Sequence, residues 1–312
     1  MTRVAAIDCG TNSIRLLVSD IADGVQTDLH REMRIVRLGQ GVDRTGRLAP
    51  EAIERTRIVL VDYAATCREL AVARTRMVAT SASRDADNSA DFHAVVLKVI
   101  GVEPEVISGD EEAALSFDGA TRALDPDDGP FLVMDIGGGS TELVLGTEQV
   151  TAARSVDVGC VRLTERHLIS DPPTVEQVAA AVRDIDAAIE QVKAVVPVDD
   201  ARTAIGLAGS VTTVAALALG LSTYDRDGIH LTRLKRADIE KVTGDVLAMT
   251  RADRAALPVM HPGRVDVIGA GALILRTLVE RLELAEVLVS EADILDGIAW
   301  SCFRKADGSG HG

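Results

Sequence analysis

The segment FLVMDIGGGSTELVLG, Phe131 to Gly146, places a glycine run between two apolar stretches. Each apolar stretch is typical of a buried strand, so the segment predicts a hairpin whose turn is built from glycine, serine and threonine. One carboxylate, Asp135, ends the first strand, and a second, Glu142, lies just inside the next. Two acidic side chains beside such a turn indicate a site as well as a fold.

An earlier segment repeats this pattern. VAAIDCGTNSIRLLV, Val4 to Val18, aligns with it at an offset of 127 residues, which places Asp8 on Asp135 and Gly10 on Gly137. Both segments then read as strand, polar turn, strand. We therefore expect a duplicated domain whose two turns face one cleft.

Strand-like and helix-like segments alternate along the chain, which is the order of α/β proteins with a mostly parallel sheet. The length of 312 residues favours two domains. The acidic, proline-bearing stretch DPDDGP marks the boundary between them. We predict domains over residues 1–124 and 125–305 and a disordered tail over 306–312.

The composition excludes several classes of partner. The net charge of −15 argues against nucleic acid and against an anionic membrane. No apolar run reaches the roughly 18 residues of a membrane span, and the N-terminus lacks the pattern of a signal peptide. The four cysteines show no C-x-x-C spacing, so packed thiols in a reducing compartment are expected. These observations favour a cytoplasmic protein.

The two turns have the composition of phosphate-binding loops. Glycine allows close approach of an anion, successive N–H groups form a nest for phosphate oxygens, and hydroxyl groups add donors. A hairpin turn without any ligand is the alternative, and the matched pair of turns disfavours it. The candidate phosphate-binding residues here are Gly10, Thr11, Asn12, Ser13, Gly137, Gly138, Gly139, Ser140 and Thr141.

The turns differ where Arg15 of the first aligns with Glu142 of the second. Arginine can bind a phosphate through two N–H groups, so Arg15 is a further phosphate candidate. A glutamate in the same place would repel phosphate unless it held a metal or a water. Asp135 and Glu142 are natural ligands of Mg²⁺, which takes few carboxylates together with phosphate oxygens and waters; a solvated Glu142 is the alternative.

The segment SGDEEA supplies a third acidic element. Ser108 and Glu111 have the spacing of a capping box, in which Glu111 would fold back on the helix start. Glu112, the next residue, then points about 100° around the helix axis from Glu111. It is the candidate general base. The alternative is that both glutamates only stabilise the helix dipole.

Three further sequence features are candidates for a role in phosphate chemistry. Arg84 follows a predicted strand, where an anion-binding group often lies, and Gly209 and Ser210 form a strand–glycine–helix turn that suits phosphate, although a structural turn explains it equally well. Cys9 and Arg15 fit the C-x5-R loop of cysteine-dependent phosphatases. That loop leads into a helix, whereas IRLLV here reads as a strand, so a Cys9 nucleophile is disfavoured.

Taken together, the chain resembles the exopolyphosphatase / guanosine pentaphosphate phosphohydrolase family from about Val4 to Trp300. The stretches that carry the resemblance occur in this order: AAIDCGTNSIRLLV, ATSASRDADN, ISGDEEAALSFDG, DIGGGSTELVLG, DVGCVRLTER, GLAGSVTT and HPGRVDVIGAGALIL. The length is similar to that of the short, two-domain members. SEADILDG, Ser290 to Gly297, departs from the family because it lacks an expected glycine and arginine.

The resemblance implies an α/β fold of two actin-like, ribonuclease-H-like domains around a central cleft. It also implies a hydrolase of phosphoric anhydrides that uses Mg²⁺, with or without a further divalent or monovalent cation, to release terminal phosphate from polyphosphate or guanosine pentaphosphate. Glu112, Asp135 and Glu142 match its catalytic carboxylates, and a homodimer is expected. The alternatives are a sugar or acetate kinase of the same fold and a non-catalytic sensor of alarmone or polyphosphate.

Overall fold

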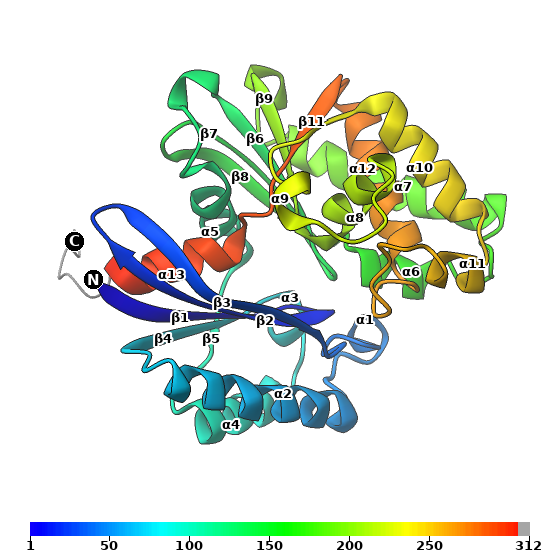
Figure 1. Ribbon diagram of the computed structural model, residues 1–312. Helices are drawn as coiled ribbons and strands as arrows, with labels where there is room; N and C mark the ends of the chain where they lie inside the picture. Colours follow the sequence, from blue (N-terminus) through cyan, green and yellow to red (C-terminus); the bar gives the residue numbers. More distant parts are fainter. Residues whose placement is uncertain (305–312) are drawn as a thin grey trace. The chain divides into compact units, whose positions relative to one another are not determined.

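The computed structural model describes residues 1–304. Its contacts divide the chain into two compact units (Figure 1). The first unit comprises Met1–Gly119 and the segment from Ile294 onward, and the second comprises Ala120–Asp293. The predicted tail, residues 306–312, lies outside the described residues. No helix within the described residues is long and apolar enough to cross a bilayer.

The first unit contains a five-stranded sheet in the order β3-β2-β1-β4-β5. Strand β1 pairs antiparallel with β2 and parallel with β4. The strands are β1 Thr2–Cys9, β2 Ser13–Ala22, β3 Val25–Ile35, β4 Arg74–Ala79 and β5 Glu105–Val106. The helices are α1 Val42–Thr45, α2 Pro50–Glu69, α3 Ser81–Arg84, α4 Ser89–Ile100, α5 Gly109–Thr121 and α13 Ile294–Arg304.

Both faces of the first sheet are covered. Alternate residues of β1 point to opposite faces, and Ala5 and Ile7 belong to the core shared with α2 and α4. Val4 and Ala6 belong instead to the core shared with α13. Figure 1 shows α2 and α4 on one side of this sheet and α13 on the other. A sheet buried on both faces explains why the strand RVAAID is almost continuously apolar.

The second unit contains a six-stranded sheet in the order β10-β11-β9-β6-β7-β8. Its strands are β6 Phe131–Ile136, β7 Thr141–Gly146, β8 Val150–Val156, β9 Thr203–Leu207, β10 Arg233–Lys235 and β11 Glu286–Val289. The helices are α6 Cys160–Arg166, α7 Val175–Lys193, α8 Ala208–Ala218, α9 Arg226–Ile229, α10 Arg236–Ala248, α11 Arg251–Ala255 and α12 Ile268–Arg281, with 3₁₀ turns at Pro126–Asp128 and Val198–Asp200.

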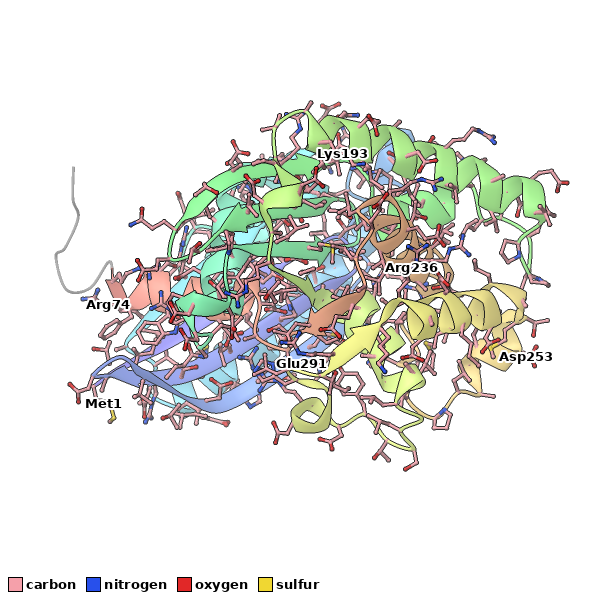
Figure 2. All side chains as sticks on the ribbon, turned by 90° about the horizontal axis from the view of Figure 1, so that it is seen from above. Met1, Arg74, Lys193, Arg236, Asp253 and Glu291 are labelled. Atoms are coloured by element: carbon pink, nitrogen blue, oxygen red, sulfur yellow. The ribbon has the colours of Figure 1, made fainter. Side chains whose placement is uncertain are left out.

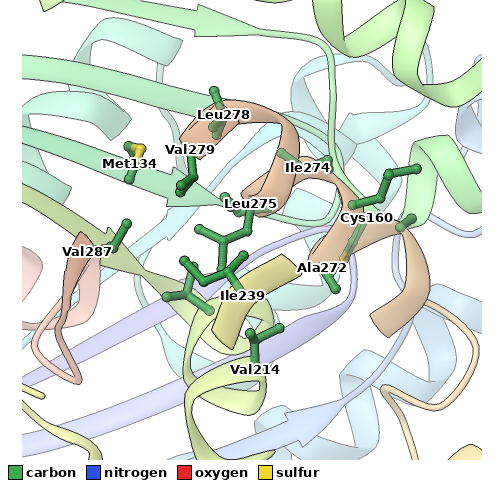
Figure 3. Close-up of a cluster of buried hydrophobic side chains, with 14 of the residues drawn as sticks. Met134, Cys160, Val214, Ile239, Ala272, Ile274, Leu275, Leu278, Val279 and Val287 are labelled. Atoms are coloured by element: carbon green, nitrogen blue, oxygen red, sulfur yellow. The ribbon is translucent and has the colours of Figure 1, made fainter. Parts of the chain in front are cut away.

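Helix α12 forms the centre of the core of this unit. Leu275, Leu278 and Val279 of α12 pack among side chains of α8, α10, β6 and β11 (Figure 3). Charged side chains cover the outside, where Lys193 and Asp253 are exposed (Figure 2). The predicted capping box of α7 is confirmed, because Thr174 and Gln177 bond reciprocally.

The predicted duplication is confirmed by the strand registers. Asp8 faces Arg15 across β1 and β2, and Asp135 faces Glu142 across β6 and β7. Each turn is closed by the same bond: Gly10 N–H donates to the Ser13 carbonyl and Gly137 N–H to the Ser140 carbonyl, both at 3.0 Å. The two hairpins therefore superimpose residue on residue at the offset read from the sequence.

Two features of the fold differ from expectation. The sheets are mixed rather than mostly parallel, because β3 and β8 each add a third antiparallel strand to a hairpin. Helix α13 packs on β1, β2 and β4 of the first unit, whereas the predicted domain of residues 125–305 assigned it to the second. Burial of its apolar face against the first sheet decides this placement, and the second unit begins at Ala120 rather than at residue 125.

Candidate functional site

The turn Gly10–Ser13, which we call the first loop, is held from its carbonyl side. Gly39 N–H donates to the Thr11 carbonyl at 2.9 Å, and the N–H groups of Val36 and Arg37 donate to the Asn12 carbonyl at 3.1 and 2.8 Å. Within residues 1–304, the N–H groups of Thr11 and Asn12 have no protein acceptor. The loop therefore has two successive backbone N–H groups available as donors, as a phosphate nest requires.

The turn Gly137–Thr141, the second loop, is built in the same way. Cys160 N–H donates to the Gly137 carbonyl at 3.0 Å, and Val161 N–H donates to the Gly138 carbonyl at 2.8 Å. Among the described residues, no protein acceptor is found for the N–H groups of Gly138 and Gly139. These two residues align with Thr11 and Asn12, so the free donors occupy equivalent places in both units.

Each loop is in close contact with a glycine from another segment, Gly39 at the first loop and Gly159 at the second, where a side chain would not fit. A Cβ on Gly159 would lie 2.4 Å from the backbone of Gly138, and a Cβ on Gly39 would lie 2.4 Å from the Thr11 Cγ2. Arg162 adds a side-chain bond from Nε to the Gly139 carbonyl at 2.8 Å. No local sequence pattern points to Gly39, Gly159 or Arg162, since their importance depends on contacts with distant loops.

The acidic pair of the second unit is buried. Asp135 is 7% exposed and Glu142 is 1% exposed, and Ser155 Oγ donates to Glu142 Oε1 at 2.7 Å. Thr141, also a phosphate candidate, donates its hydroxyl proton to the Val158 carbonyl at 2.6 Å. The Thr141 hydroxyl proton is therefore used within the protein, by the Val158 carbonyl. In the second loop, the backbone N–H groups are the donors that remain for a phosphate.

The first hairpin has an ion pair in the corresponding place. Arg15 donates to Asp8 Oδ2 through Nε at 3.0 Å and through Nη2 at 2.7 Å. The phosphate role expected for Arg15 stays a prediction, and it competes with this pair. Thr11 Oγ1 lies 2.9 Å from Ser81 Oγ, which joins the loop to the start of α3.

Glu112 lies in the first turn of α5 and is 8% exposed. Arg84 Nη1 lies 3.2 Å from Glu112 Oε2 and donates to the Ile107 carbonyl at 3.0 Å. The guanidinium group thus orients the carboxylate and stabilises its negative charge. The two residues singled out from separate segments of the sequence are brought together within the first unit.

The predicted role of Glu111 is only half confirmed. Its N–H donates to Ser108 Oγ at 3.2 Å, as in a capping box. Its carboxylate, however, pairs with Arg76 at 2.7 Å rather than with the helix start. Arg76 is only 6% exposed, and a buried cation needs a counter-charge more than the helix needs a second cap.

Gly209 and Ser210 lie in the first turn of α8, directly after β9, and Arg264 from the segment before α12 lies against the first of them. A Cβ on Gly209 would lie 2.2 Å from Arg264 Nη2, so the guanidinium lies directly against the glycine. Arg264 Nη1 donates to Thr213 Oγ1 at 3.1 Å. The stretch HPGRVDVIGAG was noticed in the sequence, but Arg264 was not assigned to a site, because only the fold shows what it contacts.

The buried cysteines support the rejection of a thiol nucleophile. Cys9 lies inside β1 with no exposed surface. Burial raises the pKa of the Cys9 thiol well above its ordinary value, and the neighbouring Asp8 adds to the effect. All four cysteines are free, and three of them are buried.

The family of the chain is now decided by comparison with known proteins. Residues 17–306 match the model of the Ppx/GppA phosphatase family. The chain belongs to this family. It is 53% identical over 314 residues to Exopolyphosphatase 2 of Mycobacterium tuberculosis, which covers 96% of this chain and 98% of that protein.

Two further similarities complete the comparison. The crystal structure of an exopolyphosphatase-like protein is 43% identical and superimposes with a TM-score of 0.94, covering 98% of this chain and 100% of that one. The guanosine-5'-triphosphate,3'-diphosphate pyrophosphatase of Aeromonas salmonicida is 29% identical over 297 residues, covering 95% of this chain and 58% of that protein. The predicted family and its actin-like α/β fold of two domains are confirmed.

Proposed function

We propose that this protein is an exopolyphosphatase that hydrolyses the terminal phosphoanhydride bond of inorganic polyphosphate. The observation that carries the proposal is the pair of loops at Gly10–Ser13 and Gly137–Thr141. Both have their carbonyls bonded to the protein and their central N–H groups available. A substrate of repeating phosphates offers the oxygens that such a nest binds, and the similarity to Exopolyphosphatase 2 supports the same assignment.

Glu112 acts as the general base in this proposal. It takes a proton from water as the water oxygen bonds to the terminal phosphorus and the bridging P–O bond breaks. Arg84 holds the carboxylate in place at 3.2 Å. The N–H groups of the two loops bind the phosphate oxygens, where preorganised donors stabilise developing charge.

Asp135 and Glu142 are the residues that would hold Mg²⁺. Within residues 1–304, there is no group of three or more His, Cys, Asp or Glu side chains placed to bind a metal ion. A facing pair of carboxylates nevertheless fits this ion, which usually takes one or two carboxylates and completes its shell with phosphate oxygens and waters. When bound, Mg²⁺ would neutralise charge on the phosphoryl oxygens.

Guanosine pentaphosphate is the second candidate substrate, because the similarity to the Aeromonas pyrophosphatase extends over 95% of this chain. The chemistry would be the same with a nucleotide leaving group. The homodimer expected from the family resemblance and the cytoplasmic location expected from the sequence remain predictions.

The test measures phosphate release with Mg²⁺ from long polyphosphate, short polyphosphate, guanosine pentaphosphate and ATP. We expect the highest kcat/KM on polyphosphate without any acceptor. Little acceptor-free hydrolysis would favour a kinase, and binding without turnover would favour a sensor.

Glu112→Gln tests the base. It should lower kcat on polyphosphate by about 10²–10⁴-fold with little change in KM. Asp110→Asn is the matched control, because Asp110 is an exposed carboxylate in the same helical turn. An equal loss in kcat and in affinity after Glu112→Gln would assign Glu112 to binding instead.

A further inference from the structure

The C-terminal helix α13 touches α5, the helix that carries Glu112, although more than 170 residues separate them in the chain. The closest approach is at Gly297, where an added Cβ would lie 2.0 Å from the Leu115 carbonyl oxygen and 2.8 Å from its carbonyl carbon. Leu115 lies three residues after Glu112 and therefore nearly one turn along the same helix. Only glycine permits backbone contact at this distance.

A second contact connects the two helices through a buried arginine. Arg76 of β4 donates to Ser301 Oγ at 2.7 Å through Nη1 and to Glu111 Oε1 at 2.7 Å through Nη2. Glu111 directly precedes Glu112. The same guanidinium thus bonds both to α13 and to the turn that presents the proposed base.

A third contact lies near the C-terminal end of α5, where Arg304 Nη2 of α13 donates to Asp118 Oδ2 at 3.0 Å. In addition, Ile298 of α13 and Leu115, in the middle of α5, belong to one buried core. The position of α5 is thus fixed near its first turn, at its middle and near its end.

The segment SEADILDG gains an explanation here. Leu295, within the segment where the family resemblance led us to expect a glycine and an arginine, is 1% exposed and belongs to the core that contains Leu115. Asp296 accepts a hydrogen bond from Gln26 at 3.0 Å and an ion pair from Arg31 at 2.5 Å, which anchors α13 to β3. The departure replaces a polar group by packing and seats the helix on the first sheet.

We propose that α13 is the positioning element of the catalytic base, with Gly297 as the residue that sets the place of α5 and hence of Glu112. This inference rests on the proposed function, because it assumes that Glu112 is the base. Misplacement of a catalytic group by about 1 Å can cost on the order of 10²-fold in rate. An alanine at position 297 would force α5 and α13 apart along their contact.

The experiment is a mutant cycle between Gly297→Ala and Glu112→Gln, measured as kcat and KM on polyphosphate with Mg²⁺. Gly297→Ala alone should lower kcat by about 10–100-fold with KM within about twofold. In the Glu112→Gln background, the same substitution should have no further effect on kcat. Gly244→Ala is the control, since Gly244 also lies inside a helix but no atom lies within 4 Å of an added Cβ.

The outcomes separate this inference from the proposed function. If Glu112→Gln alone leaves kcat unchanged, Glu112 is not the base and the proposed mechanism fails. If Glu112→Gln lowers kcat but Gly297→Ala costs the same factor in both backgrounds, its effect is merely structural and the inference is overturned. A folded Gly297→Ala protein with unchanged kcat overturns it as well.

Arg304→Ala decides the matter if Gly297→Ala does not fold. Arg304 is about half exposed, so its loss leaves the core intact. Its removal should lower kcat several-fold, and this loss should vanish in the Glu112→Gln background. A loss that persists there, or no loss at all, counts against the inference.

Discussion

The hairpins β1–β2 and β6–β7 share their register, their turn bond and their tethered loops, yet they differ in one cross-strand pair. Asp8 faces an arginine and forms an ion pair at 2.7 Å, whereas Asp135 faces a glutamate. Like charges directly opposite each other destabilise a sheet. In the first hairpin, the charge of Asp8 is thus balanced by Arg15. The second hairpin holds two buried carboxylates, Asp135 and Glu142, that a bound cation would stabilise. Under the proposed function, both hairpins bind phosphate and only the second binds the ion.

Converting the second hairpin into a copy of the first is the strongest test. Glu142→Arg should pair with Asp135 as Arg15 pairs with Asp8. We expect turnover on polyphosphate to fall on the order of 10³-fold, as when a key electrostatic group is removed, and the response to Mg²⁺ to disappear. The thermal unfolding temperature should not fall, because the new pair replaces a repulsion.

Phosphate release over a range of Mg²⁺ concentrations, together with thermal unfolding, measures both effects. Glu148→Arg is the control, because it makes the same charge change at an exposed position of the same unit. If Glu142→Arg keeps a tenth of the activity and still responds to Mg²⁺, the acidic pair is not the ion site.

The glycines behind the two loops give the next largest effect. Gly159→Ala places a Cβ 2.4 Å from the backbone of Gly138, whereas Gly39→Ala meets the Thr11 side chain. A side chain can rotate away from an added methyl group, whereas backbone atoms cannot. We therefore expect about a 10²-fold loss of kcat/KM from Gly159→Ala and about a tenfold loss or less from Gly39→Ala.

Steady-state kinetics on polyphosphate compares the two variants, and thermal unfolding shows whether both remain folded. The reverse order of effects would mean that the first loop, rather than the second, is the more demanding binding surface.

Stability should respond with opposite sign in the two hairpins. Arg15→Met removes the ion pair of the buried Asp8 carboxylate and should lower the free energy of unfolding by about 3 kcal/mol. Glu142→Gln removes a repulsion and, without metal, should raise it by about 0.5 kcal/mol. Urea denaturation in the presence of a chelator measures both, and effects of the same sign would show that the two pairs are not electrostatically different.

The parts of the fold that could be predicted are those with local signals. The hairpin repeat and the capping box of α7 follow from residues that lie close together in the chain. Strand β3, with the sequence VQTDLHREMRI, lacks apolar alternation because it is an exposed edge strand. It is ordered by its ladder with β2, a partner that no local pattern reveals.

The candidate site divides in the same way. The loop residues and Glu112 are predicted from short motifs whose spacing is local, and their chemical roles stay predictions. Glu111 was given the wrong partner because a local capping rule cannot see Arg76, 35 residues away. Arg264 was left unassigned for the same reason, since its contact with Gly209 exists only after α8 and α12 pack together.

The smallest effect is expected at Arg162, which marks the last difference between the loops. Its Nε donates to the Gly139 carbonyl at 2.8 Å, whereas the corresponding Asn12 carbonyl accepts only from main-chain N–H groups among residues 1–304. Arg162→Met should remove one charged hydrogen bond of about 1.5 kcal/mol. The main-chain bonds to Gly138 remain, so KM for polyphosphate should rise by about fivefold to tenfold with kcat nearly unchanged.

Arg162→Lys separates charge from geometry, because lysine keeps the charge but lacks the Nε donor. Arg166→Met is the control, since Arg166 lies on the same helix and pairs at the surface with Asp184. If lysine restores KM while methionine does not, the charge of Arg162 acts on the substrate directly. If both variants raise KM equally, the hydrogen bond of Arg162 acts by orienting the second loop.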